Sequence, residues 1–288
     1  MITRRDCLRY LSAGSAALFT GDAFDAFAQT PSAYKGVVLG VQSYSFRDHT
    51  LDEAIAGMKQ AGLNSCELWQ GHIEPKGVSR DAMRKWREET PLSDFHAVRA
   101  KFDKAGIRIY AYNISFKDDF TNAEIERGFD AARAFGTNII TASANTNVVK
   151  RVVPVAEQRR MTVAMHNHSR IDPNEFATPD DFVRAMSLSP RIAVNLDIGH
   201  FTAANFDATA FLREHHARIV TLHIKDRKRD NGANVPLGEG DTPIGPVLRM
   251  LRDQKWPIPA NIEYEYKGGD SLEQVRRCLD YCRRALDA

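Results

Sequence analysis

The sequence predicts an α/β protein built as a single (β/α)8 TIM barrel, a closed ring of eight parallel strands surrounded by helices. Two observations predict this fold. From residue 36 onwards, short apolar runs alternate with longer amphipathic runs, which is typical of right-handed strand–helix–strand units. Eight such units in about 250 residues match the count and length of this barrel. No linker or internal repeat interrupts them, so one domain is expected over residues 36–288.

Eight apolar runs are expected to form the barrel strands, because each is too short for a helix of ordinary length. The expected strands are Val37–Ser43, Ser65–Trp69, Arg108–Asn113, Asn138–Ser143, Thr162–His166, Ile192–Asp197, Ile219–Lys225 and Ala260–Tyr266. The amphipathic runs between them are expected to form the outer helices. The expected helices are Leu51–Ala61, Ser93–Ala105, Thr121–Phe135, Val148–Gln158, Pro179–Ser187, Asp207–His215, Pro246–Gln254 and Leu272–Leu286.

The alternative fold is a doubly wound open sheet. Such a sheet would place a glycine-rich phosphate loop after its first strand, whereas residues 42–46 read Gln-Ser-Tyr-Ser-Phe. Gly62, Gly106 and Gly136 each follow a helical run and precede a strand, as helix stops do in either fold. The count of units and the missing loop therefore favour the barrel.

The first 28 residues differ from the rest and have the order of a bacterial secretory signal. Arg4 and Arg5 stand before a short apolar stretch, Leu8–Phe19, and residues 26–28 (Ala-Phe-Ala) provide the small residues of a cleavage site. The paired arginines favour the twin-arginine (Tat) route, with the Tat export machinery as a partner and a periplasmic location. A short amphipathic helix is the alternative. No later segment approaches 18 apolar residues, so no stable membrane anchor is expected.

Charge and cysteine content limit the partners and the chemistry. The chain has 39 basic and 37 acidic residues and a formal net charge of +2, so no nucleic acid is expected to bind. Beyond the leader, Cys66, Cys278 and Cys282 are an odd number, and two of them lie four residues apart in a helical run. They are expected to be buried thiols rather than disulfides.

Polar side chains gather on one face of the last four expected strands. Residues two apart on a strand point the same way, so one set faces the helices and the other faces the barrel axis. The expected outer residues are Val163, Met165, Ile192, Val194, Leu196, Val220, Leu222, Ile224, Ile262, Tyr264 and Tyr266. The expected inner residues are Thr162, Ala164, His166, Ala193, Asn195, Asp197, Thr221, His223, Lys225, Asn261, Glu263 and Glu265. The titratable groups lie toward the carboxyl ends of the strands, where barrel enzymes have their active sites.

Four inner residues, His166, Asp197, His223 and Glu263, are predicted to bind one divalent metal ion. Unpaired charges on a buried axis would cost about several kcal/mol each. Two carboxylates and two neutral imidazoles balance and ligate an ion of charge +2. Mixed nitrogen and oxygen ligands favour Mn²⁺, Co²⁺, Fe²⁺ or Zn²⁺ over Mg²⁺. For any one residue alone, an ordinary ion pair or a structural histidine is the alternative.

These residues resemble the xylose-isomerase-like TIM-barrel superfamily of sugar phosphate isomerases and epimerases, over about residues 36–286. The resemblance rests on Cys66-Glu67-Leu68-Trp69, His166-Asn167-His168, Asp197-Ile198-Gly199-His200, His223-Ile224-Lys225-Asp226, Gly238-Glu239-Gly240-Asp241 and Ile262-Glu263-Tyr264-Glu265. It implies one divalent metal held by the four residues above and a ketose that chelates it. In the ketose 3-epimerases a glutamate stands where this chain has His166, which puts epimerisation by two carboxylates in doubt.

The other site residues are predicted from the chemistry. A carbonyl polarised by the metal acidifies the neighbouring C–H, and a base must remove that proton. The expected catalytic residues are Glu265 and His200 as candidate bases, with Glu263 and Lys225. The expected substrate-binding residues are Glu67, Trp69, His72, His168, Asp226 and Arg227. Structural alternatives stay open for some of them: a rim ion pair for Glu265, an orienting contact to Asp197 for His200, a solvated basic loop for Lys225 and Arg227, and core packing for Trp69.

The leading hypothesis for function is a sugar isomerase or epimerase that acts on an unphosphorylated keto sugar or related polyol through a metal-stabilised enediolate. Export favours the unphosphorylated substrate, because sugar phosphates are scarce outside the cytoplasm. Two alternatives stay open: a metal-dependent lyase or hydratase on 3-keto-glycosides, and a barrel that binds sugar and metal without turnover. An endonuclease on abasic DNA is disfavoured by the near-neutral charge. A homo-oligomer is compatible with the sequence.

Overall fold

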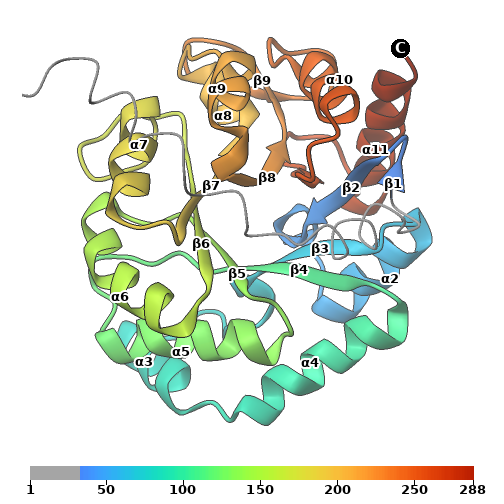
Figure 1. Cartoon of the computed structure of the whole chain (residues 1–288). Coiled ribbons are helices and arrows are strands. Elements are labelled where there is room, and N and C mark those ends of the chain that lie inside the picture. Colours follow the sequence, from blue (N-terminus) through green and yellow to red (C-terminus); the bar gives the residue numbers. More distant parts are fainter. Residues whose placement is uncertain (1–32) are drawn as a thin grey trace, which may run out of the picture.

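The computed structural model describes residues 33–288. The predicted leader, residues 1–28, lies outside the described residues. Over the part that is described, the chain forms the predicted (β/α)8 barrel, with the strands in a central ring and the helices around it (Figure 1). No helix within residues 33–288 is long and apolar enough to cross a membrane.

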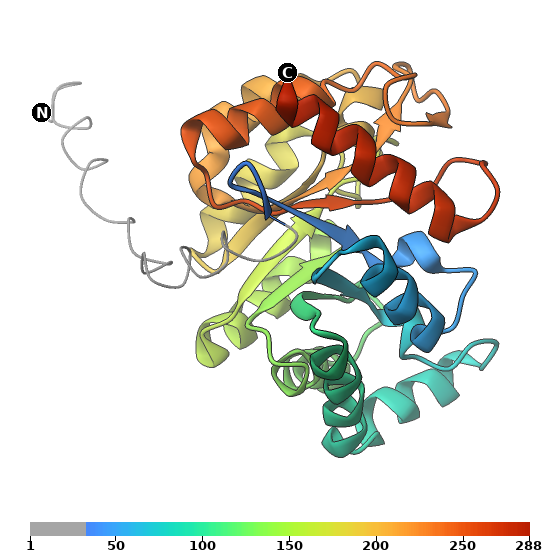
Figure 2. The same cartoon turned by 90° about the vertical axis from the view of Figure 1, so that its right-hand side faces the viewer.

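The barrel consists of eight parallel strands, and the ring closes between the first and second of them. These strands are β2 (Val37–Gln42), β3 (Ser65–Trp69), β4 (Arg108–Asn113), β5 (Ile139–Ala142), β6 (Thr162–His166), β7 (Ile192–Asp197), β8 (Ile219–Ile224) and β11 (Ala260–Ile262). A two-residue strand, β1 (Ala33–Tyr34), pairs antiparallel with β2. The Tyr34 hydroxyl donates to Asp287, which brings β1 beside the end of the last helix (Figure 2).

The helices follow the predicted positions within one or two residues, with two additional helices, α3 and α8, described below. They are α2 (Leu51–Ala61), α3 (Arg80–Glu89), α4 (Leu92–Ala105), α5 (Asn122–Ala134), α6 (Val149–Arg159), α7 (Pro179–Leu188), α8 (Ile198–Ala203), α9 (Ala208–His215), α10 (Ile244–Gln254) and α11 (Ser271–Asp287). Short 3-10 turns are η2 (Ser43–Phe46), η3 (Gln70–His72), η4 (Thr146–Val148) and η5 (His216–Arg218). Thr50, Thr121 and Thr178 each begin a helix with a reciprocal capping box, which satisfies backbone N–H groups that the helix itself leaves free.

The outer face of the strands packs against the helices in one large hydrophobic core, as the alternation predicts for β6, β7 and β11. A second, small cluster made of Val38, Tyr110, Ala111 and Ile139 lies within the ring, and Val220 packs against it. The expectation that Val220 points outward is therefore wrong. The register shifts by one residue between β7 and β8 at this point, and such a bulge turns the extra residue to the other face.

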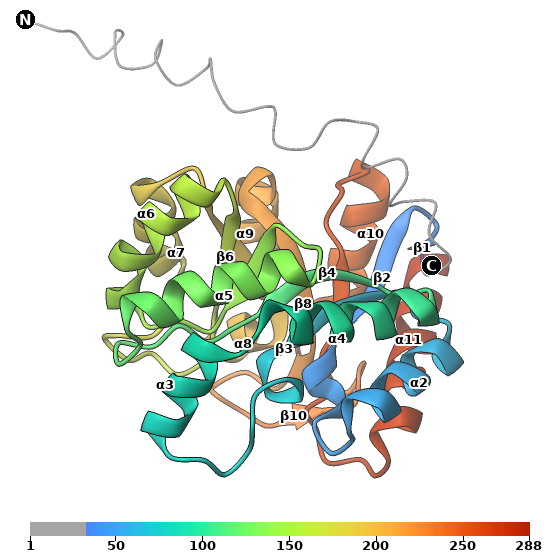
Figure 3. The same ribbon diagram turned by 90° about the horizontal axis from the view of Figure 1, so that it is seen from below.

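Three features are absent from the sequence prediction. Helix α3 has no buried residue at all, and the short α8 begins directly after β7. A small hairpin, β9 (Asp226–Arg227) with β10 (Asn234–Val235), follows β8. Helix α3 and strand β10 both lie toward the lower edge of Figure 3, on the side where the carboxyl ends of the strands open. These additions all surround the mouth of the barrel.

The last strand is shorter than expected, because β11 ends at Ile262 and not at Tyr266. Beyond it, the Tyr264 amide donates to the Ser45 hydroxyl instead of to a neighbouring strand. The alternation of side chains nevertheless continues past the strand. Tyr264 and Tyr266 are in the outer core, while Glu263 and Glu265 both reach Lys225. Glu263 and Glu265 therefore occupy the inner face as predicted, on irregular chain.

Candidate metal centre and pocket

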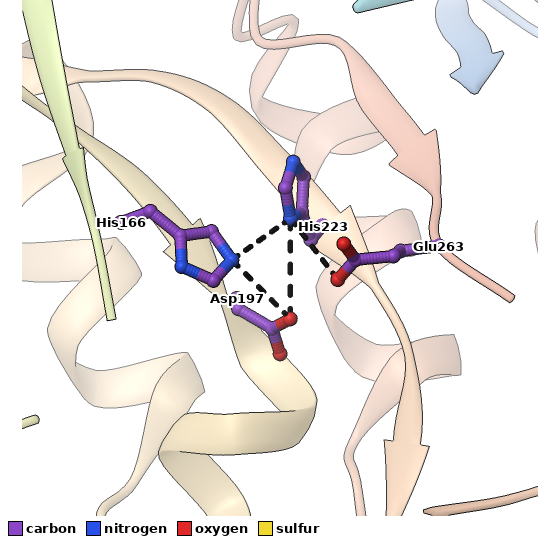
Figure 4. A group of neighbouring side chains, drawn as sticks. All are labelled: His166, Asp197, His223 and Glu263. Carbon is purple, nitrogen blue, oxygen red and sulfur yellow. Dashed lines mark hydrogen bonds and ion pairs between the residues drawn. The ribbon is translucent and has the colours of Figure 1, made fainter. Parts of the chain in front are cut away.

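The four predicted metal ligands converge at the carboxyl end of the barrel. One potential ligand atom from each of His166, Asp197, His223 and Glu263 lies within 4.8 Å of all the others, and all four residues are buried. Figure 4 shows the two imidazole rings and the two carboxylates turned toward one another. The strand register explains the meeting, because Asp197 is paired with His223 across β7 and β8.

The distances fit a single small cation. The His166 Nε2 and His223 Nδ1 atoms are 3.0 Å apart, and His223 Nδ1 is 3.3 Å from Glu263 Oε2. His166 Nε2 is 3.7 Å from Asp197 Oδ2. Two atoms bound to one ion at about 2.0–2.2 Å each stand roughly 3–3.5 Å apart, so the two shorter separations match a shared ion and the third is slightly wider.

Two buried carboxylate oxygens that lack a hydrogen-bond donor also suit a metal site. Asp197 Oδ2 and Glu263 Oε2 are buried side-chain atoms with no hydrogen-bond donor directed at them, although both lie within ion-pair distance of Lys225. Buried carboxylate oxygens without a donor are costly unless a cation takes the donor's place. The donor set of two nitrogens and two carboxylates therefore fits a divalent metal, with the identity of the ion left open.

Lys225 places an ammonium group against the cluster. Its Nζ atom is 2.7 Å from Glu263 Oε2, 2.7 Å from Glu265 Oε2 and 3.2 Å from Asp197 Oδ2. Burial alone would lower the pKa of this lysine, but the surrounding carboxylates outweigh burial and raise the pKa well above its usual value. Burial likewise opposes ionisation of Asp197, yet Lys225 holds the pKa of that carboxyl well below normal. Lys225 is therefore charged, and the Asp197 carboxyl is ionised.

His200 lies between two cations. Its Nε2 atom is 3.0 Å from Lys225 Nζ, and its Nδ1 atom is 2.7 Å from an Arg227 nitrogen. Burial lowers the pKa of His200 and the Lys225 ammonium lowers it further, so the ring is neutral. The His200 backbone N–H also donates to Asp197 Oδ1 over 2.7 Å, because Asp197 caps the short α8. The structural alternative for His200, an orienting contact to Asp197, is thus present through its backbone.

A polar pocket of about 300 Å³ opens above the cluster. Its lining residues are Gln42, Tyr44, Trp69, Asn113, Ser115, Lys117, Ser143, His166, His168, His200, His223, Lys225, Glu263 and Glu265. Trp69 meets Tyr44 edge to face with ring centroids 5.0 Å apart, which gives one wall an aromatic surface. His168 lies near the rim, 3.6 Å from Glu175, and burial lowers its pKa to about 3. The predicted site residues Trp69, His168, His200, Lys225 and Glu265 all line this pocket.

Four of the residues expected to contact substrate do not line the pocket. Glu67 is fully buried beneath it and bonds to His223. His72 turns its ring nitrogens to the Ser43 hydroxyl and the Phe46 carbonyl, behind the aromatic wall. Asp226 accepts backbone N–H groups of the loop 238–242. The Arg227 guanidinium donates to the Gly232 carbonyl and lies against His200. These side chains hold the pocket's walls and floor, and their contact with a substrate stays a prediction.

Apart from Trp69, the sequence prediction missed the lining residues from the first half of the barrel. Gln42 and Asn113 end β2 and β4, and Ser143 directly follows β5. Residues at the carboxyl ends of barrel strands are the expected place for a site, so this signal was present in the sequence. Ser115 and Lys117 lie in the loop after β4, and no strand pattern reaches them.

The chain belongs to the xylose isomerase-like TIM barrel family, whose sequence profile matches residues 55–285. A search of curated proteins finds no match to the chain. The family assignment agrees with the closed barrel and with the buried cluster at its carboxyl end.

Several solved structures share the fold. The 3-keto-D-glucoside 4-epimerase of E. coli is 16% identical, with 86% of this chain and 99% of that one covered and a TM-score of 0.65. A D-allulose 3-epimerase from Methylomonas sp. is 12% identical, with 86% and 97% covered and a TM-score of 0.66. A sugar phosphate isomerase/epimerase from Parabacteroides distasonis is 17% identical, with 84% and 94% covered and a TM-score of 0.60. At these identities the likeness extends to the fold alone.

Proposed function

We propose that the protein is a divalent-metal-dependent enzyme of the sugar isomerase or epimerase type that acts on an unphosphorylated keto sugar or related polyol. One observation carries the proposal: four potential metal ligands meet on the floor of a polar pocket, beside a carboxylate and an ammonium group positioned to handle a proton. When bound there, the ion would polarise a carbonyl and stabilise negative charge on its oxygen. Membership of the xylose isomerase-like family supports this reading.

Glu265 is the better candidate for the base that removes the substrate proton. It lines the pocket, and its side chain is 27% exposed, whereas the ligand carboxylates of Asp197 and Glu263 are 0% and 9% exposed. Both ring nitrogens of His200 already face cationic donors. A neutral imidazole has one lone pair, so His200 keeps no free nitrogen for a substrate proton. We therefore assign proton removal to Glu265 and a positioning role to His200.

Lys225 is suited to stabilise the oxygen on which charge develops. Its ammonium is buried yet faces the pocket, and it touches the proposed base directly. A preorganised cation in a water-poor site stabilises a developing oxyanion far better than one in bulk water. The contact with Glu265 also fixes the carboxylate that receives the proton. Lys225 therefore links the base to the oxygen that gains charge.

The substrate class is inferred from the pocket. A cavity of about 300 Å³ suits a small molecule, and its lining is mostly hydroxyl, amide, imidazole and charged groups. Trp69 and Tyr44 offer an aromatic wall to the C–H face of a sugar ring. The similar solved structures include a 3-keto-D-glucoside 4-epimerase and a D-allulose 3-epimerase, which supports a keto sugar.

A lyase acting on 3-keto-glycosides is the second candidate, and His166 favours it. Epimerisation needs a proton acceptor on each face of the carbon, and here the β6 position carries an imidazole that belongs to the metal cluster. Elimination and isomerisation both begin with removal of one proton next to a carbonyl, which a single carboxylate performs. The same first step therefore tests both candidates.

The test is solvent deuterium exchange into a panel of keto sugars and 3-keto-glycosides with the metal-loaded protein, followed by NMR. We expect exchange at the carbon next to the carbonyl for at least one member of the panel. Glu265→Gln should abolish that exchange with its metal content unchanged, while Glu126→Gln, an exposed glutamate of α5, should behave as wild type. Full metal occupancy with no exchange across the panel would replace this proposal by the non-catalytic binding barrel.

We also propose export by the Tat route to the periplasm, which supports the choice of an unphosphorylated substrate. The proposal rests on the sequence of residues 1–28. A fusion of residues 1–35 to a reporter that is active only after Tat export tests it. Replacing both Arg4 and Arg5 by lysine should block export, and a reporter that stays in the cytoplasm with the arginines intact would contradict the location.

A further inference from the structure

A fully buried carboxylate lies on the barrel axis below the metal cluster. Glu67 is on β3, has 0% of its surface exposed, and both of its oxygens are 3.0 Å from His223 Nε2. His223 points its other nitrogen, Nδ1, into the cluster, 3.0 Å from His166 Nε2. The His223 ring therefore bridges Glu67 and the proposed metal site.

Side chains from five other strands hold Glu67 in place. They are Gln42 of β2 (2.8 Å), Asn113 of β4 (3.4 Å), Thr141 of β5 (2.6 Å), Asn195 of β7 (3.3 Å) and Asn261 of β11 (3.2 Å), all donating to its carboxylate. Together with His223 of β8, the donors come from six of the eight barrel strands. A buried charge is tolerated when it is hydrogen-bonded in this way. The carboxylate is thus fixed by the closure of the barrel itself.

The contacts determine which nitrogen of His223 carries a hydrogen. Asn195 Nδ2 is 3.1 Å from His223 Nε2, and two N–H donors cannot bond to each other. Five other side chains already donate to the Glu67 carboxylate, so it acts as an acceptor, and Nε2 carries the hydrogen that goes to Glu67. The Asn195 amide then donates to Glu67 instead. This assignment leaves the lone pair on Nδ1, which is the atom that faces the cluster.

Gly40 makes room for this arrangement. A Cβ atom at Gly40 would lie 2.2 Å from Asn261 Oδ1 and 3.1 Å from the Ser65 carbonyl oxygen. Asn261 is the donor that β11 contributes to Glu67. The absence of a side chain at residue 40 therefore leaves the space that Asn261 needs to reach Glu67.

We infer that Glu67 is a positioning residue for metal binding: it fixes the ring orientation and the hydrogen of His223, so that Nδ1 is presented to the ion. A carboxylate that accepts the second N–H of a ligand imidazole also makes the ligand nitrogen more basic. The inference deepens the proposed function through its metal site, but it does not depend on any substrate. Its role differs from the substrate contact expected of Glu67 from the sequence.

The experiment compares Co²⁺ binding to the wild type and to Glu67→Gln, by competition with a chelator and by proton NMR of the Co²⁺-loaded protein. Loss of such an imidazole partner typically weakens metal binding by about 10–100-fold, and we expect Glu67→Gln to fall in this range. The wild type should show one metal-shifted, slowly exchanging N–H proton from His223 Nε2, and the variant should lose it or exchange it rapidly. A merely structural role would not move this signal.

Glu124→Gln is the matched control. Glu124 is an equally buried carboxylate, with 0% side-chain exposure, but it pairs with Arg80 and Arg87 outside the cluster. The Glu124→Gln variant should be less stable than the wild type but keep both the Co²⁺ affinity and the N–H signal. Wild-type affinity together with an unchanged signal in Glu67→Gln would overturn the inference.

If Glu67→Gln does not fold, a milder variant tests whether Glu67 positions His223. Thr141→Val removes one donor to Glu67, at 2.6 Å, and leaves the carboxylate and His223 in place. We expect faster exchange of the N–H proton and a loss of affinity of less than about tenfold. An unchanged exchange rate in Thr141→Val would then refute the inference. Metal binding is measured without substrate, so an absence of sugar exchange in the activity panel would leave this result standing.

Discussion

Replacing Lys225 by methionine removes the one ammonium that faces the cluster and keeps most of the side-chain volume. In the metal-free protein the change leaves Asp197, Glu263 and Glu265 without this partner, and the first two are nearly inaccessible to water. Breaking a buried ion pair from one side costs about 3–5 kcal/mol. A domain usually has about 5–15 kcal/mol of stability in total. We therefore expect the metal-free variant to lose a large fraction of its free energy of unfolding.

A bound divalent ion should offset most of this loss, because it neutralises the same oxygens. The charges of Lys225 and of the ion also repel each other: two unit charges at roughly 4 Å with an effective dielectric constant of about 20 interact by about 4 kcal/mol, and the double charge of the ion raises this to about 8 kcal/mol. Suppose that the substitution lowers the free energy of unfolding by about 4 kcal/mol without metal and by about 1 kcal/mol with metal. The thermodynamic cycle of folding and metal binding then requires that the variant bind the ion more tightly by about 3 kcal/mol, or roughly 100-fold.

The assay is urea denaturation of wild type and Lys225→Met, each with a chelator and with saturating Mn²⁺, together with a direct measurement of Mn²⁺ affinity. We expect Lys225→Met to lose much more free energy of unfolding, relative to the wild type, with the chelator than with the metal. An equal loss of the free energy of unfolding under both conditions would refute the reasoning, since it would mean that the ion does not share the oxygens that Lys225 contacts.

Three further predictions concern regions around the site. Glu124→Gln should lower the free energy of unfolding in urea by about 2–3 kcal/mol, because it uncouples a buried pair, with metal affinity unchanged; an unaltered midpoint would contradict this. Trp69→Ala should raise the KM for an active keto sugar with little change in metal content, and Gly71→Ala should do the same, because its Cβ would lie 2.2 Å from the Trp69 ring. Burial raises the pKa of Cys278 to about 11, so this thiol should stay un-ionised and unalkylated by iodoacetamide near pH 8 until the protein unfolds; peptide mapping that finds it alkylated in the native protein would disprove its burial.

The periodic parts of the fold could be predicted from the sequence, and the parts held by other forces could not. Strands and outer helices follow from apolar spacing, and their predicted bounds mostly differ from the observed ones by one or two residues. Helix α3 packs only Trp86, partly buried, against the core. Arg80 and Arg87 anchor the helix by pairing with Glu124, and Arg87 also pairs with Glu74. Ion pairs between segments that are distant in the sequence leave no periodic signal, so this helix was not predicted.

The site was predicted as far as strict alternation along a strand holds. That rule placed His166, Asp197, His223 and Glu263 on one face, and the structure brings them together. It fails at bulges, where the register shifts by one residue and turns Val220 inward. The rule also does not show how far along the barrel axis a side chain lies. Glu67, which was expected to contact substrate, therefore turns out to lie beneath the pocket.

Anomalous diffraction from crystals of the Mn²⁺-loaded protein tests most directly whether the four converging side chains bind one divalent ion. The account predicts a single strong anomalous peak at about 2.0–2.3 Å from His166 Nε2, His223 Nδ1 and one oxygen each of Asp197 and Glu263. Asp197→Asn, prepared in the same way, should lose most of this peak. A fully loaded wild-type crystal with no peak among these atoms, or with its manganese bound elsewhere, would contradict the account.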